Sequence, residues 1–148
     1  MSLPDTMRAM VLMGHGDLDQ LVFRADCPRP DPALGEVLVQ VGATGLNNTD
    51  VNTRSGWYSK AVTEATTGGT YDEVSGEDPA WGGSPITFPR IQGADVCGRI
   101  VAVGAGVDAV RIGERIIVDC WLRDPDDLWN PNKTGYFGSE RDGGFAEY

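Results

Sequence analysis

The sequence predicts a mainly β fold, a partly open β-barrel with one or two short helices. Apolar and β-branched runs recur along the chain at intervals of roughly 8–15 residues and are separated by turns. The 148 residues include 20 glycines and 9 prolines, which favours many turns and short strands. Apolar residues make up 41% and charged residues 23%, as in a globular protein with a single core.

Each predicted strand is an apolar run that is bounded by glycine, proline or polar residues. The runs cover residues 7–13, 21–24, 37–41, 90–103 and 112–118, and residues 143–148 resemble the start of another strand. Residues 27–32 (CPRPDP) are interrupted by prolines and are expected to form an extended loop.

The remaining segments are expected to be a short helix and loops. Asn and Asp side chains around residue 48 can cap a helix over about Thr49–Thr53. Residues 61–89 have little apolar periodicity and are expected to be one long excursion, with 61–81 serving as a lid or specificity loop. Residues 124–133 are polar and broken by proline. We expect residues 1–6 to be a tag or a disordered start and 7–148 to be one domain.

The charge balance excludes several classes of function. Twelve basic and 22 acidic residues give a formal net charge of -10, so no basic face for nucleic acid or for an anionic membrane is expected. No apolar run approaches the roughly 18–20 residues of a membrane span, and no signal segment is visible, so a cytoplasmic location is expected. Three widely spaced cysteines predict reduced thiols, and Cys97 is expected to be a small core residue.

Three stretches together resemble a known family. The stretches are residues 35–50 (GEVLVQVGATGLNNTD), 89–116 (PRIQGADVCGRIVAVG, then V and IGERI) and 143–148 (GGFAEY). In order and spacing they are similar to the N-terminal GroES-like domain of medium-chain dehydrogenases/reductases. The similarity runs from about Met7 to the last residue and favours the zinc-free quinone oxidoreductase type. It implies a C-terminally truncated GroES-like catalytic domain without its Rossmann cofactor domain.

The resemblance also bears on metal binding. Zinc-dependent members of the family carry Cys at the position of Asn47, His at the position of Ala94 and Glu at the position of Asp95. An amide and a methyl group are not zinc ligands, so no zinc is expected. Asp95 and Asp50 are expected to form an ion pair or a helix cap, with Asp50 bracing Arg99 or another cation. The single histidine, His15, is expected to be a solvated loop residue.

Family members transfer hydride from a nicotinamide cofactor, so the resemblance implies NAD(P)H in the full-length protein and none bound by this chain alone. Asn47 and Thr49 are the candidate catalytic residues, and Asn47 and Asn48 the candidate contacts to the cofactor. Asn47 is alternatively a turn former and Thr49 a helix cap. Trp57 and Tyr58 are candidates for stacking on a flat substrate, with core packing as the alternative.

Residues 104–109 (GAGVDA) match a dinucleotide fingerprint, but a strand follows where the helix should begin, so they are expected to form a hairpin turn. The resemblance thus implies the substrate domain of a zinc-independent NAD(P)H-dependent oxidoreductase that reduces quinones, enones or related carbonyls. The full-length protein is expected to be a homodimer or tetramer, and this chain to be inactive alone. Two alternatives stay open: a zinc-type alcohol dehydrogenase with atypical ligands, and a stand-alone GroES-like binding or oligomerising module.

Overall fold

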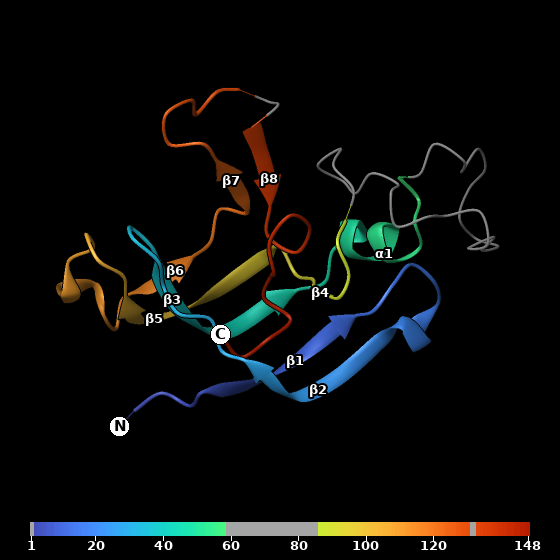
Figure 1. Cartoon of the computed structure of the whole chain (residues 1–148), viewed down its shortest axis with the longest axis horizontal. Coiled ribbons are helices and arrows are strands. Elements are labelled where there is room, and N and C mark those ends of the chain that lie inside the picture. Colours follow the sequence, from blue (N-terminus) through green and yellow to red (C-terminus); the bar gives the residue numbers. More distant parts are fainter. Residues whose placement is uncertain (1, 59–85, 131–132) are drawn as a thin grey trace.

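The computed structural model describes residues 2–58, 86–130 and 133–148 (Figure 1). These residues form two three-stranded antiparallel sheets and one two-stranded sheet. Among them are one α-helix and two 3-10 turns. The predicted excursion over 61–89 lies outside the described residues except for its last four positions. No helix in the described part of the chain is long and apolar enough to cross a membrane.

The first sheet has the strand order β2-β1-β4. It consists of β1 (Thr6–Leu12), β2 (Leu21–Pro28) and β4 (Arg90–Ile91). Inward-facing side chains alternate along β1, where Met7, Ala9 and Val11 are buried together with Ile91 of β4. This period of two is expected of a strand with one face on the core.

The second sheet has the order β3-β5-β6. It consists of β3 (Val37–Gly45), β5 (Asp95–Val103) and β6 (Arg115–Ile117). Two irregularities in the register bend β3 against β5, and the pairing ends with Gly45 opposite Asp95. This last pair fixes where the loop after β3 meets the start of β5.

The remaining elements extend from these sheets. The helix α1 (Asn48–Arg54) follows β3 directly. The 3-10 turns are η1 (Leu18–Gln20) and η3 (Ala109–Arg111). A hairpin of β7 (Trp121–Arg123) and β8 (Thr134–Tyr136) projects away from both larger sheets (Figure 1).

The last six residues connect the two larger sheets. Phe145 accepts a hydrogen bond from the backbone N–H of Met10 in β1, and Glu147 accepts one from Val41 in β3. The Glu147 carboxylate also accepts a hydrogen bond from the backbone N–H of Arg8 at 2.8 Å. The expected strand over 143–148 is represented by these bonds and by an isolated bridge between Ala9 and Ala146.

The two larger sheets do not close into a barrel, consistent with the predicted partly open architecture. Between them lies a cavity of about 870 Å³ whose walls include Met7, Val11, Leu38, Val96 and Ile116. Neither Asn47 nor Asp95 lines this cavity, so the candidate catalytic turn lies outside it.

The predicted strands are confirmed, with shifted ends and a division of residues 90–103 into β4 and β5. β2 continues through Cys27 and Pro28, which were expected to lie in a loop. Neither β7 nor β8 was predicted. Gly104 and Gly106 form the expected turn: Val107 N–H donates to Gly104, and only a three-residue 3-10 turn follows.

The expectation that Cys97 is a core residue is wrong. Cys97 is exposed because side chains alternate along β5, and the buried positions are those of Val96 and Ile100. Its partner across the pairing with β6 is Ile117, which is also exposed, so this face of the sheet is uncovered in the described chain.

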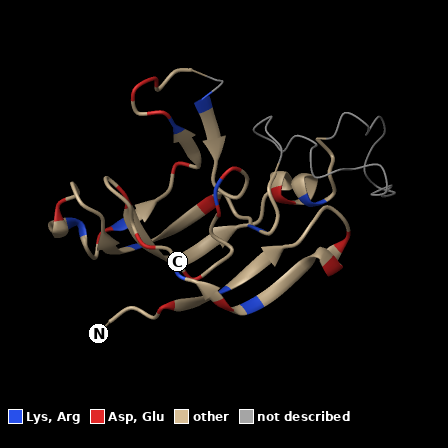
Figure 2. Ribbon diagram, in the orientation of Figure 1, with Lys and Arg blue, Asp and Glu red and all other residues tan. Residues whose placement is uncertain are grey.

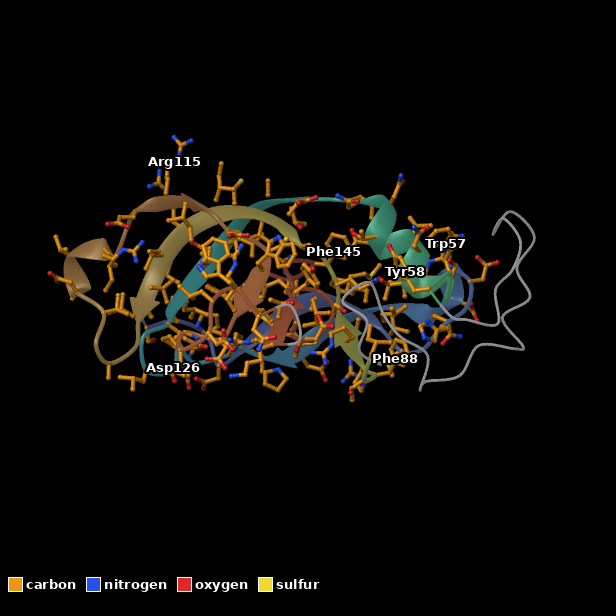
Figure 3. All side chains as sticks on the ribbon, turned by 90° about the horizontal axis from the view of Figure 1, so that it is seen from above. Trp57, Tyr58, Phe88, Arg115, Asp126 and Phe145 are labelled. Atoms are coloured by element: carbon orange, nitrogen blue, oxygen red, sulfur yellow. The ribbon has the colours of Figure 1, made fainter. Side chains whose placement is uncertain are left out.

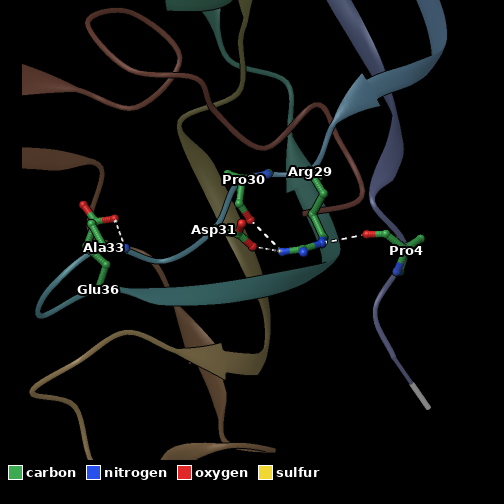
Figure 4. A network of polar contacts seen from close by, with 6 residues as sticks. All are labelled: Pro4, Arg29, Pro30, Asp31, Ala33 and Glu36. Atoms are coloured by element: carbon green, nitrogen blue, oxygen red, sulfur yellow. Dashed lines mark hydrogen bonds and ion pairs between the residues drawn. The ribbon is translucent and has the colours of Figure 1, made fainter.

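Polar contacts hold the segment before β3. The Arg29 guanidinium donates to the carbonyl oxygens of Pro4 and Pro30 and to the Asp31 carboxylate (Figure 4). Pro4, in the segment expected to be a tag or a disordered start, is therefore attached to the end of β2. Acidic and basic residues are interspersed along the described chain (Figure 2).

Candidate functional site

The candidate site is the turn between β3 and α1. Asn47 is the N-cap of the helix, with extended backbone angles, and Asp50 is the third helical residue. The Asn47 side chain accepts from Thr49 N–H, and the Asp50 carboxylate accepts from Asn47 N–H at 2.8 Å. This reciprocal arrangement is a capping box, and it confirms the predicted short helix within one residue at each end.

The Asn47 amide is held at both of its ends. Its Oδ1 accepts the Thr49 N–H at 3.2 Å, and its Nδ2 donates to Asp95 Oδ2 at 3.0 Å. Capping explains the first contact. The second depends on the β3–β5 register, which places Asp95 opposite Gly45, two residues before Asn47. Asn47 is exposed, and the amide retains one N–H that Asp95 does not use.

Asp50 is a buried carboxylate that joins this turn to the segment before β5. Its side chain is buried. Its Oδ1 accepts a hydrogen bond from the Gly93 N–H at 3.1 Å, and its Oδ2 accepts one from the Asn47 N–H. Burial raises the pKa of the Asp50 carboxyl, the two backbone N–H donors oppose that rise, and the nearby Asp95 charge adds to it.

The expectation that Asp50 braces Arg99 is wrong. Arg99 donates to the carbonyl oxygen of Gly113 at 2.9 Å. It lies four residues along β5 from Asp95, roughly 13 Å at the rise of a strand, which takes it away from the helix. The alternative of a helix cap is confirmed for Asp50, whose carboxylate completes the capping box of α1. The Asp95 carboxylate instead accepts a hydrogen bond from the Asn47 amide.

The donor set at this turn does not fit a zinc ion. Asn47 offers an amide that already bonds Asp95, and Ala94 offers only a methyl group. Burial and the charges of Asp119 and Asp95 raise the pKa of the nearby Cys120 thiol. Across the described residues, no three His, Cys, Asp or Glu side chains are grouped so that they could hold a metal ion.

The other candidate residues lie along α1. Asn48 begins the helix and is exposed, and Thr49 is half-buried, with a side-chain hydroxyl that bonds none of the described residues. Trp57 and Tyr58 follow the other end of the helix, with their rings edge to face at 5.4 Å (Figure 3). Trp57 is 44% exposed, so it is not a core residue. Seven helical residues, roughly 10 Å, separate these rings from Asn47.

The loop after β1 holds the far end of α1. His15 Nδ1 donates to the Thr53 carbonyl at 2.8 Å, and its ring packs edge-on against Phe88 at 4.9 Å between centroids. Gly16 N–H donates to the Arg54 carbonyl. The expectation that His15 is solvated is therefore wrong: the glycines on either side of it let the loop fold against the helix. His15 thus positions the helix that carries the candidate site.

Asp95 is the functional candidate that sequence reasoning undervalued. It stands where zinc-dependent relatives have an acidic residue, and that correspondence was the available signal. Its contact with Asn47 spans 48 positions in the chain and depends on strand register, which spacing alone does not give.

Known proteins share this architecture. Residues 33–148 match the alcohol dehydrogenase GroES-like domain family. An L-threonine 3-dehydrogenase from Pyrococcus abyssi is 30% identical over 134 residues, covering 86% of this chain and 32% of that protein. A solved structure of a candidate alcohol dehydrogenase from Sinorhizobium meliloti 1021 is 47% identical with a TM-score of 0.75, covering 98% of this chain and 37% of its own.

A second solved structure from Sinorhizobium meliloti 1021, a candidate zinc-binding dehydrogenase bound to NADP, is 26% identical with a TM-score of 0.69. It covers 98% of this chain and 36% of its own. This chain thus spans about a third of the length of the curated relative above, 32%. These three relatives are named as alcohol, threonine and zinc-binding dehydrogenases. The family match over residues 33–148, on a fold with the same mainly β architecture, shows that the chain belongs to the alcohol dehydrogenase GroES-like domain family.

Proposed function

We propose that this chain is the substrate domain of a longer NAD(P)H-dependent oxidoreductase that reduces carbonyl compounds without a metal ion at Asn47. The observation that carries the proposal is the Asn47 amide, exposed at the turn after β3 and bonded to Asp95 at 3.0 Å. A side chain fixed in this way is a hydrogen-bond donor, whereas the metal-binding relatives need a ligand at that position.

The chemistry follows from what such a donor does. A nicotinamide cofactor, when bound, supplies the hydride. As hydride reaches the conjugated carbon of a quinone or enone, or the carbonyl carbon of a simple carbonyl compound, negative charge develops on the oxygen, and an N–H aimed at that oxygen stabilises it. We infer that the Asn47 amide donates to this oxygen, with the hydroxyl of Thr49, two residues further along the chain, as the second candidate donor. Asn48, which is exposed at the start of α1, is the proposed contact to the cofactor.

The substrate class follows from the strength of the donor. A neutral amide polarises a carbonyl oxygen less than a metal ion does. The substrate must therefore already be electron-poor, as in quinones and enones, whose conjugation stabilises the developing charge. Support for a nicotinamide cofactor comes from the NADP bound in the zinc-binding relative. The zinc in that relative's name is the point on which our proposal departs from it.

The test uses the longer protein that contains this chain, assayed for NADH and NADPH oxidation with quinones, enones and simple aldehydes. Activity on the conjugated carbonyls is expected to survive exhaustive dialysis against a chelator. The substitution Asn47→Ala is expected to lower kcat/KM by about 10²–10³-fold, the usual effect of removing one such donor.

The matched control is Gln40→Ala, which removes an exposed amide from β3 at a distance from the turn and is expected to leave kcat/KM unchanged. Metal analysis completes the test. Stoichiometric zinc whose removal abolishes the reaction, or full activity in N47A, contradicts the proposal. The first result favours the alternative of a zinc-type alcohol dehydrogenase with atypical ligands.

A further inference from the structure

The Asn47 amide has two possible orientations, and its neighbours distinguish them. In the observed one, Oδ1 faces the Thr49 N–H and Nδ2 faces the Asp95 carboxylate. A half-turn of the amide would place its oxygen against the carboxylate and its NH₂ against the N–H of Thr49. Both contacts would then be repulsive. The observed orientation leaves the second N–H of the amide available.

The surroundings of Asp95 favour this arrangement. Its partner in the β3–β5 pairing is Gly45, and a Cβ atom at Gly45 would lie 3.2 Å from the Asp95 Cβ. The glycine therefore leaves space for the Asp95 side chain beside the turn. Among the described residues, the Asn47 amide is the one hydrogen-bond partner of this carboxylate, so no guanidinium or ammonium group competes for it.

We infer that Asp95 is a positioning residue, whose carboxylate fixes the Asn47 amide so that its free N–H meets the substrate oxygen. The inference rests on the proposed function and names the group on which that function depends. Asp95 does not touch the substrate in this arrangement. A carboxylate is a better acceptor than a neutral oxygen, since hydrogen bonds to charged groups are about twice as strong. The arrangement selects ligands that present an acceptor oxygen.

The contact itself is tested on the 148-residue chain by NMR of the side-chain amide groups. The Asn47 resonance pair is assigned by its absence from the spectrum of N47A. In Asp95→Ala the pair is expected to shift upfield and to lose protection from hydrogen exchange, while Asp95→Asn, which keeps an acceptor oxygen, retains most of both. An unchanged Asn47 pair in D95A overturns the inference. If D95A does not fold, Asp95→Ser takes its place in the comparison.

The consequence for the reaction is tested in the longer protein. D95A is expected to lower kcat about tenfold, within the range for losing a hydrogen bond to a charged group, with little change in KM. D95N is expected to restore most of kcat, which a merely structural role would not predict. The control is Asp108→Ala, which removes the cap of η3 and is expected to leave kcat unchanged.

The two hypotheses fail in different ways. If N47A leaves hydride transfer intact, the proposed function fails, even where the NMR contact between Asn47 and Asp95 is present. If N47A is inactive while D95A changes neither the amide spectrum nor kcat, the function stands and the positioning role of Asp95 is wrong.

Discussion

Asn47 has two contacts with different meanings. The bond from Thr49 N–H to its Oδ1 is what any N-cap asparagine makes, and it needs no functional explanation. The bond from its Nδ2 to Asp95 adds nothing to the cap, because it joins the turn to another strand. The functional hypothesis therefore depends on the second contact, and removing Asp95 tests it without removing the cap.

Asp50 allows a prediction about stability. Asp50→Asn replaces one of two acceptor oxygens with an NH₂ group, so that either Asn47 N–H or Gly93 N–H faces a donor. Burial raises the pKa of Asp50, so the neutral side chain also gains from not desolvating a charge. The unpaired buried N–H is expected to outweigh that gain, with a loss of about 1–3 kcal/mol in unfolding free energy. Urea denaturation of the 148-residue chain measures it.

The matched control for this prediction is Asp108→Asn at η3. Asp108 also accepts a backbone N–H, from Val110 at 3.0 Å, but it is exposed and has one such bond. Asparagine caps as well as aspartate, so D108N is expected to change the unfolding free energy by less than about 0.5 kcal/mol. Equal urea midpoints for D50N and the unmodified chain would contradict the importance of the buried carboxylate.

The residue-level predictions from sequence succeeded where the signal was local. The cap and helix at residues 47–54 follow from Asn and Asp at fixed offsets, and the structure confirms them. The partners of Asp50, Asp95 and His15 were missed, because each depends on a strand register or on a loop folding back. Such contacts carry no signature in residue spacing.

At the scale of elements, the pairing of β3 with β5 positions the site, and Gly98 permits it. A Cβ atom at Gly98 would lie 2.2 Å from the backbone oxygen of Gln40 and 2.7 Å from Val39 Cγ1. Gly98→Ala therefore requires the strands to separate. We expect a loss of more than about 3 kcal/mol or a failure to fold. Circular dichroism during urea denaturation measures this loss.

Gly42 provides the control in the same sheet. It lies at the bulge of β3 beside Gly98, where an added Cβ would be 3.7 Å from the nearest atom, an ordinary contact. Gly42→Ala is expected to be neutral or to stabilise the chain by up to about 1 kcal/mol. Similar losses in G98A and G42A would show that the close approach of β3 and β5 is not what limits stability.

The elements that were not predicted are short. β7 and β8 have three residues each, and only Trp121, Leu122 and Tyr136 give them apolar character. A strand of this length is recognised only together with its partner: Trp121 pairs with Tyr136 across the loop that joins β7 to β8. The longer strands β1, β3 and β5 were predicted because each contains an apolar or β-branched run of several residues.

At the scale of the whole molecule, ion pairs between distant residues hold the end of the chain to the sheets. Glu36, just before β3, accepts from Arg141 at 2.7 Å, and Glu147 pairs with Arg8 of β1. In both cases the hydrogen bond from the arginine is the main cause that lowers the pKa of the glutamate. These contacts anchor the segment that joins the two sheets, which otherwise enclose an open cavity.

The pH dependence of the unfolding free energy follows from the directions of these pKa shifts. A carboxyl whose folded pKa is lowered stabilises the fold above its ordinary value, 4.5 for Glu36, and that contribution is lost as the pH falls through the folded pKa. Asp50 has the opposite sign, because its raised pKa removes stability as the pH rises through it. The lowered carboxyls include Asp26, Glu36, Asp119, Asp124 and Glu147. Unfolding free energy is therefore expected to fall as the pH drops below about 4–5.

Glu36→Gln isolates one part of this dependence. The variant keeps an acceptor for Ala33 N–H but loses the charge that faces Arg141, so it is expected to be less stable at pH 7. The difference should be below about 1 kcal/mol, since both side chains are partly exposed, and it should shrink as the pH falls. Glu114→Gln, which breaks a local pair with Arg111, is the control for an ion pair that does not join the chain end to β3. Parallel stability curves for E36Q and the unmodified chain, measured by urea denaturation from pH 7 to pH 3, would show that Glu36 does not link the chain end to β3 in solution.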